Sequence, residues 1–125
     1  MKLSIIIPTF NNINFLKFCL KSIKNNSKYQ HQVILHINDG SDGTFEFAKE
    51  NNIDFTHSRT NIGLCSSINK ATSLIDTEYI LYAHDDMFFC NYWDFFLENE
   101  IKKYTNNFYY LTGTNVSQNN GLINY

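Results

Sequence analysis

The sequence predicts an α/β fold with a mostly parallel sheet and helices on both of its faces. Short, continuous apolar runs recur along the 125 residues, which is typical of strands buried on both faces. Segments with the spacing of amphipathic helices separate these runs. The alternation of the two patterns is that of a parallel sheet built from strand–helix units.

Five apolar runs account for the expected strands. The first run ends at Pro8, and the fourth ends in a pair of adjacent carboxylates. A short apolar run bounded by turn residues indicates a buried strand. We expect strands at Leu3 to Ile7, Val33 to Ile37, Ile53 to His57, Tyr79 to Ala83 and Phe108 to Leu111.

Helices are expected between the runs, each identified by apolar residues that recur on one face. Asn11 or Asn12 can cap the first helix. The expected apolar faces are Leu16, Cys19, Leu20 and Ile23; Phe45, Phe47 and Ala48; Leu64, Ile68, Ala71 and Ile75; and Trp93, Leu97, Ile101 and Tyr104. No linker or repeat interrupts the pattern, so a single domain is expected over residues 1–125.

Composition excludes several classes of protein and partner. Hydrophobic residues make up 43% and aromatic residues 16%, which argues against a disordered chain. The formal net charge of −2 provides no polybasic surface, so no nucleic-acid partner is expected. Three cysteines without CxxC spacing favour a reducing compartment. No run is long enough for a signal peptide or a membrane span. We expect a cytoplasmic location, with which peripheral association at the inner face of a membrane is compatible.

Three polar loops that follow strand ends carry the candidate site. They are Pro8-Thr9-Phe10-Asn11, Asn38-Asp39-Gly40-Ser41 and His84-Asp85-Asp86. Carboxyl ends of parallel strands lie along one edge of a sheet, where ligands bind. Adjacent carboxylates such as Asp85 and Asp86 repel each other unless a cation offsets the charge, and a divalent cation prefers such oxygen ligands. With Phe10 to cover a base and Asp39 to accept from a base N–H, the edge suits a nucleotide diphosphate.

Each loop also has an ordinary structural interpretation. Thr9-Phe10 can be a helix cap and a packing residue, and Asp39-Gly40 can be a plain turn. Asp85-Asp86 can be a solvated acidic loop. Ser66 and Ser67 have no adjacent base and are expected on a helix surface. It is the joint order of the loops, rather than any one of them, that favours a site.

That order resembles the family 2 glycosyltransferases, which have the Rossmann-like GT-A fold. Four segments carry the resemblance, in order along the chain: the opening strand and loop from Ser4 to Asn11, the Asp-Gly-rich turn from Asn38 to Thr44, Asn61-Ile62-Gly63 with the later Asn69, and the strand from Tyr79 to Asp86. Together they span roughly Leu3 to Leu111, and at these spacings the set is specific.

The resemblance implies a donor-binding role for this chain and a role for each matching residue. Thr9 and Phe10 would contact the base of a nucleotide-diphosphate sugar, which the resemblance implies is UDP-linked, and Asp39 would hydrogen-bond that base. Asp85 would lie near the ribose and diphosphate and share with Asp86 the binding of Mn²⁺ or Mg²⁺. The nucleotide-sugar site implied in this way comprises Pro8, Thr9, Phe10, Asn11, Asp39, Asn61, Asn69, His84 and Asp85.

The chain departs from the family pattern at three positions. Asn38 replaces the first Asp of the Asp-Gly-rich turn. Ala83 stands where many members have the first acid of the metal motif, so the metal would depend on Asp85 and Asp86. Ile68 stands where many members have an arginine. Stabilisation of the diphosphate charge would therefore depend on the metal or on Arg59.

Length leads to a further expectation. Family members carry an acceptor-binding half after the fifth strand, which supplies the catalytic base, and nothing after Thr112 can do so here. We therefore expect the donor-binding part of an inverting enzyme that glycosylates a glycan or lipid-linked acceptor. Exposed apolar surface left by a missing half predicts self-association. The alternatives are a non-catalytic nucleotide-sugar-binding or interaction module, and a nucleotidyltransferase, which usually has a glycine-rich basic loop after its first strand.

Overall fold

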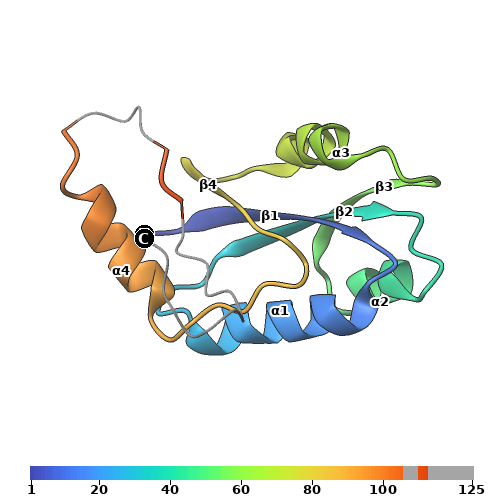
Figure 1. Ribbon diagram of the computed structural model, residues 1–125, viewed down its shortest axis with the longest axis horizontal. Coiled ribbons are helices and arrows are strands. Elements are labelled where there is room, and N and C mark those ends of the chain that lie inside the picture. Colours follow the sequence, from blue (N-terminus) through green and yellow to red (C-terminus); the bar gives the residue numbers. More distant parts are fainter. Residues whose placement is uncertain (106–109, 113–125) are drawn as a thin grey trace, which may run out of the picture.

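The computed structural model describes residues 1–105 and 110–112. Strands and helices alternate through most of this length (Figure 1). In chain order they are β1 (Leu3–Phe10), α1 (Ile13–Asn26), β2 (Gln32–Asn38), α2 (Thr44–Glu50), β3 (Asp54–Ser58), α3 (Leu64–Ala71), the 3₁₀ helix η1 (Thr72–Leu74), β4 (Tyr79–Tyr82) and α4 (Trp93–Ile101). Within the described part of the chain, no helix combines the length and apolarity needed to cross a bilayer.

The strands form one parallel sheet in the order β3-β2-β1-β4. Helix α3 covers one face, while α1, α2 and α4 lie on the other (Figure 1). The α/β class and the placement of helices on both faces are thus confirmed. β1 is paired on both sides, with β2 and with β4, so the loops that follow these three strands lie next to one another at the carboxyl edge of the sheet.

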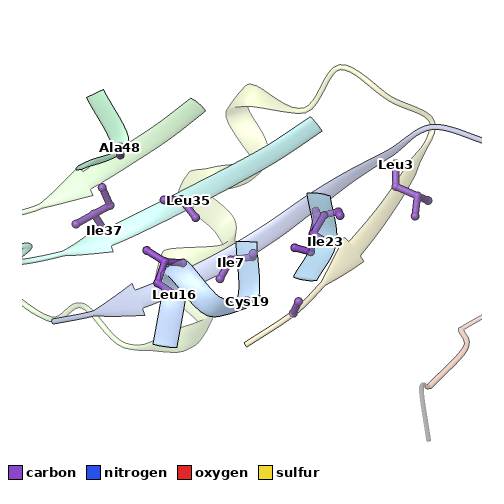
Figure 2. Close-up of a cluster of buried hydrophobic side chains, with 10 residues drawn as sticks. Leu3, Ile7, Leu16, Cys19, Ile23, Leu35, Ile37 and Ala48 are labelled. Atoms are coloured by element: carbon purple, nitrogen blue, oxygen red, sulfur yellow. The ribbon is translucent and has the colours of Figure 1, made fainter. Parts of the chain in front are cut away.

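The two faces of β1 supply two separate cores. Ile5 and Ile7 are fully buried in the larger cluster with Leu16 of α1 (Figure 2). Ile6 points the other way and packs with Ala71 of α3. Successive residues of a strand face opposite sides, so an unbroken apolar run is what a sheet covered on both faces requires.

β1 runs further than predicted, because Pro8 lies inside the strand rather than at its end. Pro8 pairs with His36 of β2 in the ladder. In a parallel strand, alternate residues direct their backbone groups to the same neighbour, and the carbonyl of Ile6 faces Ala83, just after β4. Pro8 therefore faces the β4 side, beyond the four residues of β4, where its missing N–H leaves no ladder partner unpaired.

The predictions for the fifth strand and for the end of the third helix have different outcomes. Residues 106–109, which include much of the expected strand Phe108 to Leu111, lie outside the described residues, and Tyr110 and Leu111 are not in a strand. The third helix ends at Ala71, and Ile75 follows the 3₁₀ turn rather than extending the helix.

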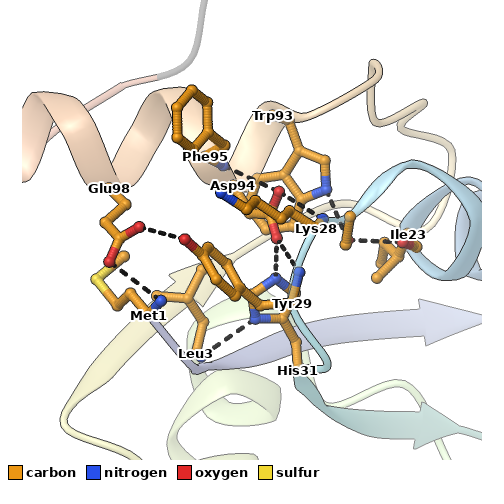
Figure 3. Close-up of polar contacts among 11 residues, drawn as sticks. Met1, Leu3, Ile23, Lys28, Tyr29, His31, Trp93, Asp94, Phe95 and Glu98 are labelled. Carbon is orange, nitrogen blue, oxygen red and sulfur yellow. Dashed lines mark hydrogen bonds and ion pairs between the residues drawn. The ribbon is translucent and has the colours of Figure 1, made fainter.

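A buried polar network joins α4 to the segment between α1 and β2 (Figure 3). Asp94 is only 1% exposed and accepts the backbone N–H groups of Lys28 and Tyr29 at 2.9 and 2.7 Å. Its Oδ2 also lies 3.0 Å from Nε2 of His31, whose Nδ1 accepts the N–H of Leu3. With Nδ1 accepting, the proton of the neutral ring is on Nε2, which donates to Asp94. This network lies at the amino end of the sheet and fixes α4 in place.

Candidate functional site

A pocket of about 360 Å³ lies at the carboxyl ends of β1 and β2 and the start of α3. It is lined by backbone and side-chain groups from four separate stretches of chain, which meet only because the strands are parallel. Its lining comprises Pro8, Thr9, Phe10, Asn11, Asn12, Asn38, Asn61, Gly63, Leu64, Ser67 and Asp85. Six of these were predicted as nucleotide-sugar-binding residues: Pro8, Thr9, Phe10, Asn11, Asn61 and Asp85.

Asp85 is held in one orientation at the edge of this pocket. The Thr9 hydroxyl donates to Oδ2 at 2.7 Å, and the Asn12 side-chain amide donates to Oδ1 at 3.1 Å. Asp86 is exposed and has no hydrogen-bond or ion-pair partner among the described residues. The two adjacent carboxylates are therefore unequal, one fixed by the protein and the other free to bind a ligand.

The acidic pair raises the proton affinity of neighbouring groups. Burial, followed by the negative charges of Asp85 and Asp86, raises the pKa of Cys19 to about 12. Burial and the same two charges also raise the pKa of Tyr82 above its ordinary value. Cys19 is thus a protonated core thiol that packs under the loop, with its sulfur 3.6 Å from the carbonyl oxygen of His84. The pair concentrates negative charge that a bound cation would offset.

Asp39 is tied to the loop after β1 by a second set of hydrogen bonds. Its Oδ2 accepts from Asn11 Nδ2 at 3.0 Å and from the Ser41 hydroxyl at 3.2 Å. The same Asn11 side chain accepts the N–H of Gly40 at 3.0 Å. Asn11, Asp39 and Gly40 all have positive φ values, of 46°, 60° and 84°. Such angles are least costly for Asn, Asp and Gly, which explains these residue types in the two loops.

Asn38 connects three parts of the pocket and is 4% exposed. Its Nδ2 donates to the Ser67 hydroxyl at 3.0 Å and, at 3.4 Å, to the carbonyl of Thr9. Its Oδ1 accepts the N–H of Ile62 at 2.9 Å. A carboxylate at this position could not donate to a carbonyl, so the replacement of the family's first Asp by Asn38 matches the local hydrogen bonding.

Asp42 caps α1, a role expected of Asn11 or Asn12. Helix α1 has no cap from the side chain of Asn12, which is directed to Asp85 instead. The N–H of Ile13 donates to Asp42 Oδ2 at 2.8 Å, while Thr44 donates to Oδ1 through both its N–H and its hydroxyl. Burial alone would raise the pKa of Asp42, but these hydrogen bonds outweigh it and lower the pKa. The capping prediction was wrong because the side chain of Asp42, which is distant in sequence, accepts the N–H group at the start of α1.

The donor set suits a hard divalent cation that also binds phosphate. Among the described residues, no group of three or more His, Cys, Asp and Glu side chains could hold a metal by itself. Asp86 and the second lone pairs of Asp85 offer oxygen ligands of the kind preferred by Mg²⁺ and Mn²⁺. Such ions commonly complete their coordination with substrate phosphates and water, so the residues present fit a metal brought together with a nucleotide.

Three of the predicted nucleotide-sugar-binding residues, Asp39, Asn69 and His84, lie outside the lining of the pocket, as do the predicted metal ligand Asp86 and Arg59. His84 is exposed, and its ring lies against that of Tyr82 with centroids 5.0 Å apart. Asn69 is exposed on α3, and Arg59 is exposed after β3. Among the described residues, His84, Asn69 and Arg59 form no hydrogen bond with the side chains that hold Asp85 or Asp39.

Several lining residues were missed by the sequence analysis. Asn12, Gly63 and Leu64 flank predicted residues, so proximity in sequence was the available signal. Ser67 was expected on a helix surface but is fully buried, because its hydroxyl accepts from Asn38 and donates to the carbonyl of Gly63. Only its spacing of four residues from Gly63 hinted at the latter contact.

Comparisons with known proteins identify the family and the fold. A TarS structure of S. aureus, residues 1–349, is 19% identical with a TM-score of 0.66; the match covers 81% of this chain and 32% of that one. The mannosyltransferase PcManGT from Pyrobaculum calidifontis, in complex with GDP-Man and Mn²⁺, is 17% identical with a TM-score of 0.66, covering 84% and 32%. TarS has also been solved with UDP and with UDP-GlcNAc. This chain thus spans about a third of the length of these structures.

No curated protein matches the chain significantly. At the identities above, the likeness to solved structures establishes the fold, which is that of GT-A glycosyltransferases. The family model described as Glycosyl transferase family 2 matches residues 4–124, nearly the entire sequence. The chain therefore belongs to glycosyl transferase family 2.

Proposed function

We propose that this chain is the donor-binding part of a glycosyltransferase that uses a nucleotide-diphosphate sugar, specifically a UDP-sugar. The observation that carries the proposal is the pocket of about 360 Å³ at the carboxyl edge, with Phe10 and Asp85 among its lining residues. The UDP-GlcNAc complex of TarS and the GDP-Man complex of PcManGT support this class of ligand. The complete protein would transfer the sugar with inversion to a glycan or lipid-linked acceptor.

The base of the nucleotide is assigned to the loops after β1 and β2. Phe10 is 50% exposed, so its ring is available to cover a base. Asp39 Oδ2 is occupied by Asn11 and Ser41, whereas Oδ1 accepts no hydrogen bond from the described residues. A uracil N–H can donate to this free oxygen, whose direction is set by the two bonds to its partner oxygen.

The diphosphate is assigned to the loop after β4. Mn²⁺ or Mg²⁺ bound there would offset the charge that develops on the departing nucleoside diphosphate. Asp86 is the freer ligand for the ion, and Asp85, held by Thr9 and Asn12, is presented in a fixed direction beside it. Fixing one carboxylate in this way lowers the entropic cost of binding.

Transfer of the sugar to an acceptor also needs a catalytic base. The alternative function is a non-catalytic nucleotide-sugar-binding module. Among the described residues that line the pocket, Asp85 is the sole carboxylate, and two hydrogen bonds occupy it. Asp94 and Glu98 belong to the network at the opposite end of the sheet. Sugar transfer or donor hydrolysis by the purified chain would eliminate the non-catalytic alternative.

Calorimetry of UDP binding in the presence and absence of Mn²⁺ tests the site. We expect the wild-type chain to bind UDP more tightly with Mn²⁺, and Asp86→Ala to lose about tenfold or more of that Mn²⁺-dependent affinity. Asp76→Ala is the matched control, since Asp76 is an exposed carboxylate that pairs with Lys2 near the start of β4. Equal affinity of the wild type and Asp86→Ala, or no UDP binding by the wild type, would refute the assignment.

A further inference from the structure

The outer side of α1 and the loop after β4 share an exposed apolar surface that the proposed site does not use. Phe15, Phe18, Met87 and Phe88 are 58%, 54%, 42% and 57% exposed. The rings of Phe18 and Phe88 stack with centroids 5.4 Å apart. Phe15 lies one helical turn from Phe18, and Met87 adjoins Phe88 in the sequence. We call these four residues the aromatic patch. Contiguous exposed apolar groups of this kind mark an interaction surface, whereas single ones do not.

A stripe of lysines runs along α1 beside the aromatic patch. Lys17, Lys21 and Lys24 are spaced four and three residues apart, so they lie on one face of the helix. The 14 residues of α1 contain no Asp or Glu. Lys17 lies over the ring of Phe47, while Lys21 and Lys24 have neither an ion pair nor a hydrogen bond with any described residue. This lysine stripe is thus a local excess of positive charge on a chain whose net charge is −2.

We propose that the aromatic patch and the lysine stripe dock the protein on the surface of an anionic lipid bilayer. An amphipathic helix with aromatic residues on one side and lysines on the other is the arrangement that binds the headgroup region. Aromatic rings insert at the boundary between headgroups and acyl chains, and lysines contact anionic headgroups. Helix α1 lies on the outside of the molecule, on the face opposite α3, so nothing in the described structure separates it from a flat surface (Figure 1).

The charge on this surface favours a membrane over a second copy of the chain. In a two-fold dimer the same patch meets itself, which would bring the two lysine stripes towards one another without acidic partners on α1. An anionic bilayer instead supplies negative charge along the full length of the stripe. The interaction is local and electrostatic, so raising the ionic strength weakens it.

The aromatic patch also adjoins the candidate site. Met87 and Phe88 follow Asp86 directly, and α1 begins next to Asn12, which holds Asp85. Docking would therefore bring the acidic edge of the sheet close to the bilayer. This inference is independent of the proposed function, because vesicle binding by the patch requires neither a nucleotide nor a metal.

Vesicle co-sedimentation of the 125-residue chain tests the proposal. The probes are vesicles of phosphatidylcholine alone and vesicles with about a third phosphatidylglycerol, in about 0.1 M NaCl. At roughly 1 kcal/mol for each lysine, Lys21→Gln with Lys24→Gln should lower the partition coefficient on the anionic vesicles about 30-fold. Lys2→Gln with Lys103→Gln removes the same charge from two exposed lysines elsewhere and should leave it within about threefold.

A second pair of variants tests the aromatic contribution. Phe18→Ser with Phe88→Ser should weaken binding on the order of tenfold, and both side chains are more than half exposed, so the fold should tolerate the change. Thermal melting checks that tolerance. Equal partitioning onto both kinds of vesicle, or equal losses for the two lysine pairs, would overturn the proposal. So would a dimer in sedimentation equilibrium that Phe18→Ser dissociates, if the chain does not bind anionic vesicles.

Discussion

The hydroxyl of Thr9 donates a 2.7 Å hydrogen bond to Oδ2 of Asp85, which follows it by 76 residues. Thr9 is 3% exposed near the end of β1, and Asp85 lies in the loop that follows β4. Because β1 and β4 are neighbours in the sheet, the bond joins the ends of adjacent strands. It orients one carboxylate of the acidic pair and leaves the other, Asp86, free for a ligand.

Thr9→Val should weaken metal-dependent UDP binding while leaving the fold intact. Valine has nearly the same shape but cannot donate to Asp85, so the carboxylate loses one of its two restraints. We expect about tenfold weaker binding with Mn²⁺, and a loss of about 1–2 kcal/mol in the free energy of unfolding. Calorimetry and urea denaturation measure the two effects. Thr60→Val, at an exposed loop position, is the control, and equal affinities for the two variants would contradict the role of Thr9.

Asn38→Ala should destabilise the chain through the groups that it leaves unpaired. Ile62 N–H would lose its acceptor, and the hydroxyl of Ser67 would lose its donor inside the protein. We expect a loss of about 2–3 kcal/mol in the free energy of unfolding, measured in urea. Asn14→Ala, on the exposed side of α1, should change it by less than about 0.5 kcal/mol. Similar values for the two variants would show that Asn38 does not connect the loops.

Stability should fall in two stages on acidification. Burial is the main cause that lowers the pKa of His31 and of His36 in the folded chain. On acidification the unfolded chain therefore takes up these protons first, so stability is complete above about pH 6.5 and declines as the pH falls through the folded values. Asp94 has a lowered pKa because hydrogen bonds outweigh the effect of burial, so its contribution is lost below about pH 4. Urea denaturation at pH 7.5, 5.5 and 3.5 measures both stages.

Variants of His31 and Asp94, which form a buried pair, identify the source of each stage of the stability loss. His31→Gln should reduce the difference between pH 7.5 and 5.5 without abolishing it, since His36 remains. Asp94→Asn should cost about 3 kcal/mol at pH 7.5, whereas the exposed Asp76→Asn should cost less than about 0.5 kcal/mol. A pH profile unchanged by His31→Gln would assign the first stage to other groups.

Thiol reagents should distinguish the three cysteines. Cys65 and Cys90 are exposed, whereas Cys19 is buried and its pKa is raised to about 12. Since the thiolate is the reacting form, we expect fast labelling of two thiols at pH 8 and of the third only in denaturant. Mass spectrometry of partly labelled chain identifies the sites. Rapid modification of Cys19 in the native chain would show that the loop above it opens readily.

Much of the fold could be predicted from local patterns. The apolar run of β1 and the helical spacing of Leu16, Cys19 and Ile23 reflect which side chains of each element are buried. These side chains are close together in the sequence, so the pattern can be recognised there. The acidic pair at the end of β4 could be predicted for the same reason, since the strand and its end are adjacent in sequence. Strand boundaries could not be predicted in this way, because the extension of β1 through Pro8 depends on where the neighbouring strand β4 ends.

By itself, the sequence determined the α/β class, the order of the elements and the residue types at the carboxyl edge. Only the tertiary structure decided which partners those residues take: Thr9 and Asn12 with Asp85, Asp42 with the start of α1, and Asn38 with Ser67. It also buried Asp94, which the local sequence gives no reason to place inside. The physical reason is that the periodicity of apolar residues indicates only whether a side chain faces water. A hydrogen bond between distant segments depends instead on strand order and register.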